Sequence, residues 1–224
     1  MAKFKFSKEE IDKINKAAAH VESVSSGEVL TAVIKESSDY AFPELLFSLT
    51  GGFIYYLIMM FFHSGVERLI GQLFWNPPLW YVTAFYGATT LIVIGLLYIM
   101  SNISGFDRLI VSKTALHRNV YRRAMLHFTE SGAVNTRDRT GIMFFISIRE
   151  QLVEIIADEG INSKVEDGAW DDILIRLLSS IKDGRTADGL EKAIFECADI
   201  LEKHFPVKSD DVNELPDGIV FLED

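Results

Sequence analysis

Residues 135–148, NTRDRTGIMFFISI, contain the stretch that decides the expected fold of the soluble part of the chain. Its second half, residues 141–148, is a run of large apolar side chains, which is typical of a strand covered on both faces. Arg149 and Glu150 then form a tight turn, and residues 151–157 (QLVEIIA) make a second run of strand length. Because the connection is short, the two runs are predicted to pair as an antiparallel hairpin. We interpret the polar half of the stretch mainly as the turn that leads into a central strand, and only secondarily as a candidate polar site.

Helical patterns surround this hairpin. Ser7 and Glu10 have the spacing of a capping box, in which a hydroxyl and a carboxylate satisfy free amides at a helix start. Residues 28–35 (EVLTAVIK) read as a short buried strand. Apolar stripes at helical spacing predict helices over about residues 8–24, 112–130, 170–181 and 186–205. The soluble part is therefore predicted to be an alternating α/β domain.

Two long uncharged segments indicate a membrane hairpin. The chain is 49% hydrophobic, and residues 45–62 and 69–105 contain no Asp, Glu, Lys or Arg. The first segment has 18 residues and spans about 27 Å as a helix, close to the roughly 30 Å of a bilayer core. Residues 79–100 give a second helix of sufficient length, and Trp80 and Tyr81 at its start suit the headgroup region. The sequence predicts two transmembrane helices, over about residues 45–62 and 79–100.

The membrane hairpin divides the soluble domain in the sequence. The strand at residues 28–35 precedes it, and a lone strand cannot satisfy its backbone groups. We therefore expect that strand to join the later strands in one sheet, with the hairpin as an insertion. The expected division is residues 1–40 as the first helix and strand, 41–105 as the hairpin, 106–206 as the remainder of the domain, and 207–224 as a solvated acidic tail.

Charge predicts the orientation and the compartment. Lys and Arg are frequent after the second apolar helix, whereas the connection between the two helices carries only Arg68. By the positive-inside rule, both termini are expected to be cytoplasmic in a two-pass protein of the bacterial inner membrane. The single cysteine, Cys197, suits a reducing compartment. A formal net charge of −10 argues against nucleic-acid binding.

Four short sequence motifs resemble those of a known family. They are NTRDRTG at residues 135–141, VEIIADEGI at 153–161, GRTADGL at 184–190 and NELPD at 213–217. Together they resemble the bacterial membrane-bound branch of the TPM domain family, which is named for a thylakoid lumen protein, a photosystem repair protein and a nematode receptor modulator. The resemblance implies a small mixed β-sheet with helices on both faces, an α/β/α sandwich. It also implies functions reported for relatives, which include acid phosphatases, calcium binders, and assembly, repair or receptor-accessory factors.

Acidic residues near the ends of the two predicted hairpin strands are candidate metal ligands. Oxygen ligands at such density suit Ca²⁺ or Mg²⁺. The alternative is that these carboxylates cap helices and solvate loops. Other family members have Asp-Asn-Gly before the apolar strand, where this chain has Arg139, Thr140 and Gly141. The candidate ligands are Asp138, Asp158, Glu159, Glu166 and Asp167.

Arg137 and Arg139 are candidates for binding an anion. Arginine binds phosphate and carboxylate groups through two parallel hydrogen bonds. The alternative is that both pair with acids such as Asp138, Glu130 or Glu154, or lie toward anionic lipid headgroups. No nucleophile motif, phosphate-binding loop or dinucleotide fingerprint is present, so no catalytic residue is assigned.

The sequence favours a membrane-anchored TPM-like domain that acts as an interaction or accessory module at the cytoplasmic face of the membrane. A metal-dependent phosphatase at the membrane surface and a Ca²⁺-binding sensor are the alternatives. The expected partners are the lipid bilayer and a membrane or cytoplasmic protein. Glycines in the two apolar helices also permit a homo-oligomer.

Overall fold

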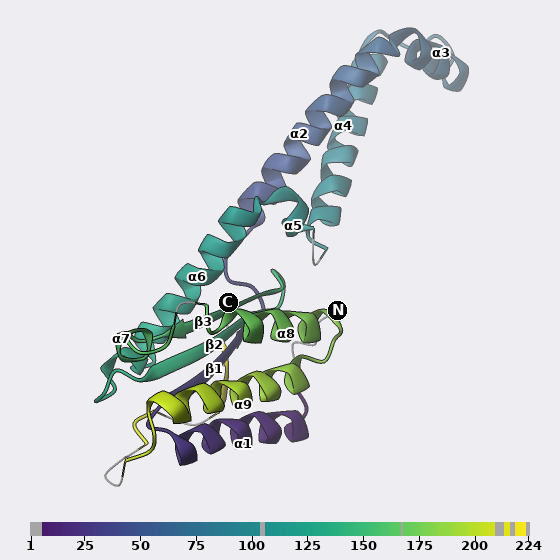
Figure 1. Cartoon of the computed structure of the whole chain (residues 1–224). Coiled ribbons are helices and arrows are strands. Elements are labelled where there is room, and N and C mark those ends of the chain that lie inside the picture. The colour runs from purple at the N-terminus through teal and green to yellow at the C-terminus, as the bar shows by residue number, and fades with distance from the viewer. Residues whose placement is uncertain (1–5, 104–105, 167, 209–212, 216–217, 223–224) are drawn as a thin grey trace. The chain divides into compact units, whose positions relative to one another are not determined.

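The computed structural model describes residues 6–103, 106–166, 168–208, 213–215 and 218–222. The chain divides into two compact units, one formed by residues 1–38 and 114–224 and the other by residues 39–113 (Figure 1). The first unit is the α/β domain, and the second contains the apolar helices. The second unit covers more residues than the range of 41–105 that the sequence suggests for the hairpin.

One mixed four-stranded sheet forms the centre of the α/β unit, in the order β3-β2-β1-β4. Strand β1 (Glu28–Ile34) lies parallel to β2 (Gly141–Ser147), with Glu28 opposite Gly141 and Ile34 opposite Ser147. Strand β3 (Leu152–Ala157) runs antiparallel to β2, as the short connection predicts. Because β1 precedes the apolar helices and β2 follows them, the apolar hairpin is an insertion between two neighbouring strands of one sheet.

Alternate residues of the central strands fill two separate cores. On one face, Val33 of β1 and Phe144 of β2 pack in a cluster with side chains of α1 (Lys8–Val24), α8 (Asp171–Lys182) and α9 (Thr186–His204). On the other face, Phe145 packs in a second cluster with side chains of α6 (Lys113–Glu130). Figure 1 shows helices on both sides of the strands. Every residue of β1 and β2 is buried, which confirms the α/β/α class and explains the uninterrupted apolar run in β2.

Local signals position the first helix. The Ser7 hydroxyl accepts a hydrogen bond from the Glu10 amide at 3.2 Å, and the Glu10 carboxylate accepts one from the Ser7 amide at 2.6 Å. This reciprocal capping box satisfies two amides that the helix itself leaves without partners. It is the start signal that the sequence predicts for α1.

The second unit contains two long apolar helices, α2 (Ala41–Phe61) and α4 (Trp80–Ser101), and both are long and apolar enough to cross a membrane. They pack closely at Gly51 and Gly52. A Cβ atom at Gly52 would lie only 2.2 Å from Cγ1 of Ile94, and one at Gly51 would lie 2.5 Å from Cδ1 of Leu97. Most of the remaining apolar side chains of both helices point outward and are exposed. In water such a surface would be unstable, whereas lipid tails would cover it.

Several of the described elements were not predicted from the sequence. Helix α3 (His63–Leu73) lies between α2 and α4, and the short helices α5 (Asp107–Ile110) and α7 (Glu159–Asn162) occur in connections. Strand β4 (Ile219–Leu222) lies within the segment expected to be a solvated acidic tail. It pairs in parallel with β1, from Thr31 opposite Ile219 to Ile34 opposite Leu222, so this part of the C-terminal segment belongs to the sheet.

Candidate functional site

The candidate site lies at the end of the sheet where β2 begins and β3 ends. Three connections meet there: the turn before β2, the segment from Asp158 through α7, and the segment that follows α9. The turn is tied to the sheet by hydrogen bonds. The Thr140 hydroxyl donates to the Ser26 carbonyl at 2.7 Å, and the Thr140 amide donates to the Thr136 hydroxyl at 3.0 Å. The two threonines therefore help to hold the backbone of residues 135–141 in place.

Arg139 and Asp158 form a two-point ion pair across this end of the sheet. Nη2 of Arg139 donates to Oδ1 of Asp158 at 2.9 Å, and Nε lies 2.8 Å from Oδ2. The side chain of Asp158 is 5% exposed and that of Arg139 is 50% exposed. Oδ1 of Asp158 also accepts from the Glu159 amide, which caps the first turn of α7. Asp158 is therefore a structural carboxylate that joins the turn before β2 to the segment after β3.

The same two segments approach so closely that only glycine fits at position 160. A Cβ atom there would lie 2.4 Å from the Asp138 carbonyl oxygen and 2.5 Å from the Arg139 carbonyl oxygen. Arg139 itself has a positive φ of 58°, a conformation that side-chain-bearing residues rarely adopt. The close approach and the left-handed residue place the carbonyl groups of the turn directly against α7.

Asp138 forms the second ion pair of the site. Its carboxylate accepts a hydrogen bond from Nζ of Lys208, which belongs to the segment after α9. The hydrogen bond to Lys208 and the charges of Lys208, Arg137 and Lys164 hold the pKa of Asp138 below its ordinary value, against a smaller opposing effect of burial. Asp138 is therefore a carboxylate that is ionised at neutral pH and already bonded to a cation of the chain.

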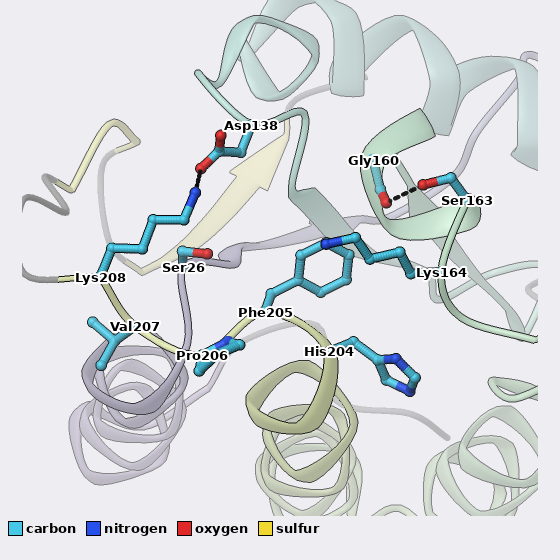
Figure 2. A pocket seen from close by; sticks show the side chains of 10 residues that line it. All are labelled: Ser26, Asp138, Gly160, Ser163, Lys164, His204, Phe205, Pro206, Val207 and Lys208. Atoms are coloured by element: carbon cyan, nitrogen blue, oxygen red, sulfur yellow. Dashed lines mark hydrogen bonds and ion pairs between the residues drawn. The ribbon is translucent and has the colours of Figure 1, made fainter.

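A cavity of about 460 Å³ opens between these segments (Figure 2). Figure 2 shows Asp138 and Lys208 directed toward each other on one side and Lys164 over the ring of Phe205 on the other. Nζ of Lys164 lies 4.5 Å from the centre of that ring, a cation–π contact. The lining residues are Ser26, Asp138, Gly160, Ser163, Lys164, His204, Phe205, Pro206, Val207 and Lys208. The cavity combines basic side chains with an apolar floor, so its chemistry suits an anionic or amphipathic group better than a cation.

The other sequence candidates lie outside this cavity. The side chain of Glu159 is 86% exposed and its carboxylate lies 3.9 Å from Nη2 of Arg139. Glu166 is exposed on the connection between α7 and α8, and Asp167 lies outside the described residues. The backbone amide of Arg137 donates to both carboxylate oxygens of Glu214, at 3.1 and 3.0 Å. Arg139 pairs with Asp158, an acid from the candidate metal set, and not with the acids named as its alternative partners.

The residues present fit a divalent cation poorly. Among the described residues, no group of three or more His, Cys, Asp or Glu side chains is arranged to hold a metal ion. Ca²⁺ and Mg²⁺ require several oxygen ligands around one point. Here the carboxylates of Asp138 and Asp158 are bonded instead to Lys208 and Arg139. Calcium or magnesium binding stays a prediction.

Sequence reasoning missed the basic and aromatic part of the cavity. Lys164 follows α7, whereas Phe205 and Lys208 belong to the segment after α9, and none of the three stands in a recognisable motif. Phe205 read as the end of the apolar stripe of the last helix. Only the fold brings these three side chains together with Asp138.

The chain was compared with known proteins. Residues 105–200 match the family model TPM_phosphatase, described as the TPM domain. Among solved structures, the BA42 protein from the psychrophilic bacterium Bizionia argentinensis, determined by NMR, is similar in fold. Its TM-score is 0.57, its sequence identity is 20%, and the match covers 96% of this chain and 94% of that chain. No curated protein matched the chain. The match to the TPM domain family therefore lies in residues 105–200, which include β2, β3, α6, α7, α8 and most of α9.

Proposed function

We propose that the chain is a membrane-anchored TPM domain that acts as an interaction or accessory module at the cytoplasmic face of a bacterial inner membrane. The anchor would be the hairpin of α2 and α4. Its support is that two helices of sufficient length leave most of their apolar side chains exposed. The hairpin is inserted between β1 and β2, so the domain would be held at the membrane by two chain crossings.

One observation carries the assignment as a module and not as an enzyme: the buried carboxylate of Asp158 and the exposed carboxylate of Asp138 are both already bonded to cations of the chain. Asp158 is bonded to Arg139 and Asp138 to Lys208. A general base must accept a proton at the pH of the reaction, and Asp138 is a weak base because its hydrogen bond to Lys208 lowers its pKa. Both pairs instead fix the surface formed by the turn and α7, which supports a binding role.

A metal-dependent phosphatase is the second candidate function. It is supported by the name of the matched family model and by the cavity, where Lys164 and Lys208 would attract a phosphate group. A Ca²⁺ sensor would use the same carboxylates. Both alternatives require that a metal ion compete with Arg139 or Lys208 for a carboxylate.

A direct assay separates these functions. The full chain in lipid nanodiscs is incubated with p-nitrophenyl phosphate, with and without millimolar Ca²⁺ or Mg²⁺, and its thermal stability is followed in the same buffers. The module predicts neither metal-dependent hydrolysis nor metal-dependent stabilisation. Hydrolysis that requires a metal and is lost in Lys164→Ala but kept in Lys182→Ala would establish the phosphatase instead. Lys182 is an exposed lysine of α8 and serves as the matched control.

The binding role is tested by cross-linking in cells. A photoreactive residue in place of Glu159, which is highly exposed beside the cavity, should form a discrete adduct with a protein. The same residue in place of Lys192, exposed on α9, is the control. Adducts at both positions with equal yield, or at neither, would contradict a specific interaction at this end of the domain.

A further inference from the structure

Helix α6 differs in charge from the rest of the chain. The whole chain carries 32 Asp and Glu against 22 Lys and Arg. Residues 109–129, which include nearly all of α6, contain four Lys or Arg and no Asp or Glu. The basic residues are Lys113, Arg118, Arg122 and Arg123. The helix is thus a local positive segment in an acidic protein.

The two faces of α6 have different environments. Leu116, Val120, Ala124 and Phe128 are buried, and the last three belong to the second core cluster of the domain. The opposite face is exposed, and Arg118 and Arg122 lie on it one turn apart. Within the described part of the chain, neither arginine forms a hydrogen bond or ion pair through its side chain. Their positive charges are therefore available to a partner outside the domain.

Amphipathic and apolar side chains accompany these arginines. Tyr121 is 52% exposed and Leu126 is 49% exposed on the same helix. A combination of unpaired arginines, a tyrosine and a leucine matches what the interfacial region of a bilayer accommodates, because phosphate groups lie beside the first acyl carbons there. An acidic protein surface would need the charges but not the exposed leucine.

The position of α6 in the chain indicates that the partner of its exposed face is the membrane. Helix α4 ends at Ser101 and α6 begins at Lys113, so the basic helix follows the second apolar helix after a short connection. The cytoplasmic leaflet is negatively charged and attracts basic segments next to a membrane-spanning helix. We infer that the exposed face of α6 binds the phosphate groups of anionic phospholipids through Arg118 and Arg122, and thereby docks the TPM domain on the membrane. This inference rests on the proposed membrane anchoring.

The expected effect is large enough to measure. A basic side chain near an anionic leaflet strengthens association about fivefold, so the loss of two arginines should lower the ratio of docked to undocked domain roughly 30-fold. The interaction is between exposed charges, so salt should weaken it as well. Neutral lipids should not support it.

The test places an environment-sensitive fluorophore on α6 in the full chain. Leu126→Cys is labelled and reconstituted in nanodiscs of phosphatidylcholine alone or with 30% phosphatidylglycerol, and the fluorophore reports burial in the interface by a blue shift. The natural Cys197 is fully buried, and burial raises the pKa of its thiol, so it should not compete for the label. The variants are Arg118→Gln/Arg122→Gln and, as the control with the same charge change elsewhere, Lys182→Gln/Lys192→Gln.

We expect a blue shift only in the anionic discs, reversed by 0.5 M salt, absent in the α6 variant and kept in the control variant. The same emission in both kinds of disc, or a shift that survives the loss of both arginines, would overturn the contact of α6 with lipid. A shift that requires added cytosolic protein would assign the face to a protein partner and overturn it too. Failure of the chain to incorporate into discs of either composition would refute the anchoring, and is recognised separately because chain and discs then elute apart.

Discussion

Replacing Arg139 by alanine and by glycine separates the stabilisation from its ion pair from the cost of its backbone conformation. Arg139 makes the two-point ion pair with Asp158 and also holds a left-handed backbone, with φ of 58°. Arg139→Ala removes the ion pair but keeps the unfavourable backbone. Arg139→Gly removes the same ion pair and relieves the backbone. The difference between the two variants therefore measures the backbone strain, and their common loss reflects the ion pair.

The magnitudes follow from burial. The side chain of Asp158 is 5% exposed and that of Arg139 is 50% exposed, so half of the pair is screened by solvent. Asp158 keeps the hydrogen bond from the Glu159 amide after Arg139 is removed, so its carboxylate is not left without a partner. We expect Arg139→Ala to lower the free energy of unfolding by about 1–2 kcal/mol, which is below the roughly 1.5–3 kcal/mol of a hydrogen bond to a charged group because solvent screens half of the pair. A left-handed conformation costs a residue with a Cβ atom about 1 kcal/mol relative to glycine, so Arg139→Gly should be the more stable variant by about that amount.

Urea unfolding of the full chain in detergent, followed by tryptophan fluorescence, gives both values. Glu159→Ala is the matched control, because its side chain is almost fully exposed and lies only at the edge of the pair. It should change the free energy of unfolding by less than about 0.5 kcal/mol. Equal stability of Arg139→Ala and Arg139→Gly would show that the backbone at position 139 is not strained. If neither variant is less stable than the original chain, the ion pair does not stabilise the fold.

Three further predictions follow from single contacts. Gly52→Leu should prevent α2 and α4 from packing, because its Cβ atom would overlap Ile94. Gly95→Leu should be tolerated, because its Cβ atom would meet nothing within 4 Å. Limited proteolysis in detergent compares the two variants. Stability should fall on acidification below the ordinary pKa of an aspartate, because Lys208 lowers the pKa of Asp138 in the folded state, and Lys208→Gln should reduce this fall in urea titrations at different pH. The pKa of His127 is lowered by burial and, to a lesser extent, by the charge of Arg123. Its contribution to stability is therefore present above the ordinary histidine pKa of about 6.5 and is lost as the pH falls below it. In urea titrations at different pH, this loss should be absent in His127→Asn.

Local patterns predicted most of the fold. The capping box of Ser7 and Glu10, the apolar run of β2 and the short turn to β3 are all encoded by neighbouring residues, and each has its predicted form. The insertion of the hairpin followed from the argument that β1 needs a partner strand. Strand β4 could not be found in this way, because it is only four residues long and its partner β1 lies nearly the whole chain away.

The candidate site was only partly predictable. The sequence indicated the turn before β2 and the start of α7, and these do meet at the contact of Gly160 with the carbonyl groups of Asp138 and Arg139. The partner of each charged residue was beyond local reasoning, because Arg139–Asp158 and Asp138–Lys208 pair across separate connections. Carboxylates that are close in sequence suggested a metal site. Their pairing with Arg139 and Lys208 depends instead on tertiary contacts, which sequence spacing does not reveal.

The membrane topology is the most direct test of the central claim. Single cysteines at Gln72, exposed on α3 in the connection between the apolar helices, and at Glu202, exposed on α9, are treated in spheroplasts with a membrane-impermeant maleimide. A two-pass protein with its α/β domain in the cytoplasm predicts labelling of Gln72→Cys in intact spheroplasts and of Glu202→Cys only after the membrane is permeabilised. Labelling of both positions without permeabilisation, or release of the chain from membranes by alkaline carbonate, would contradict the account.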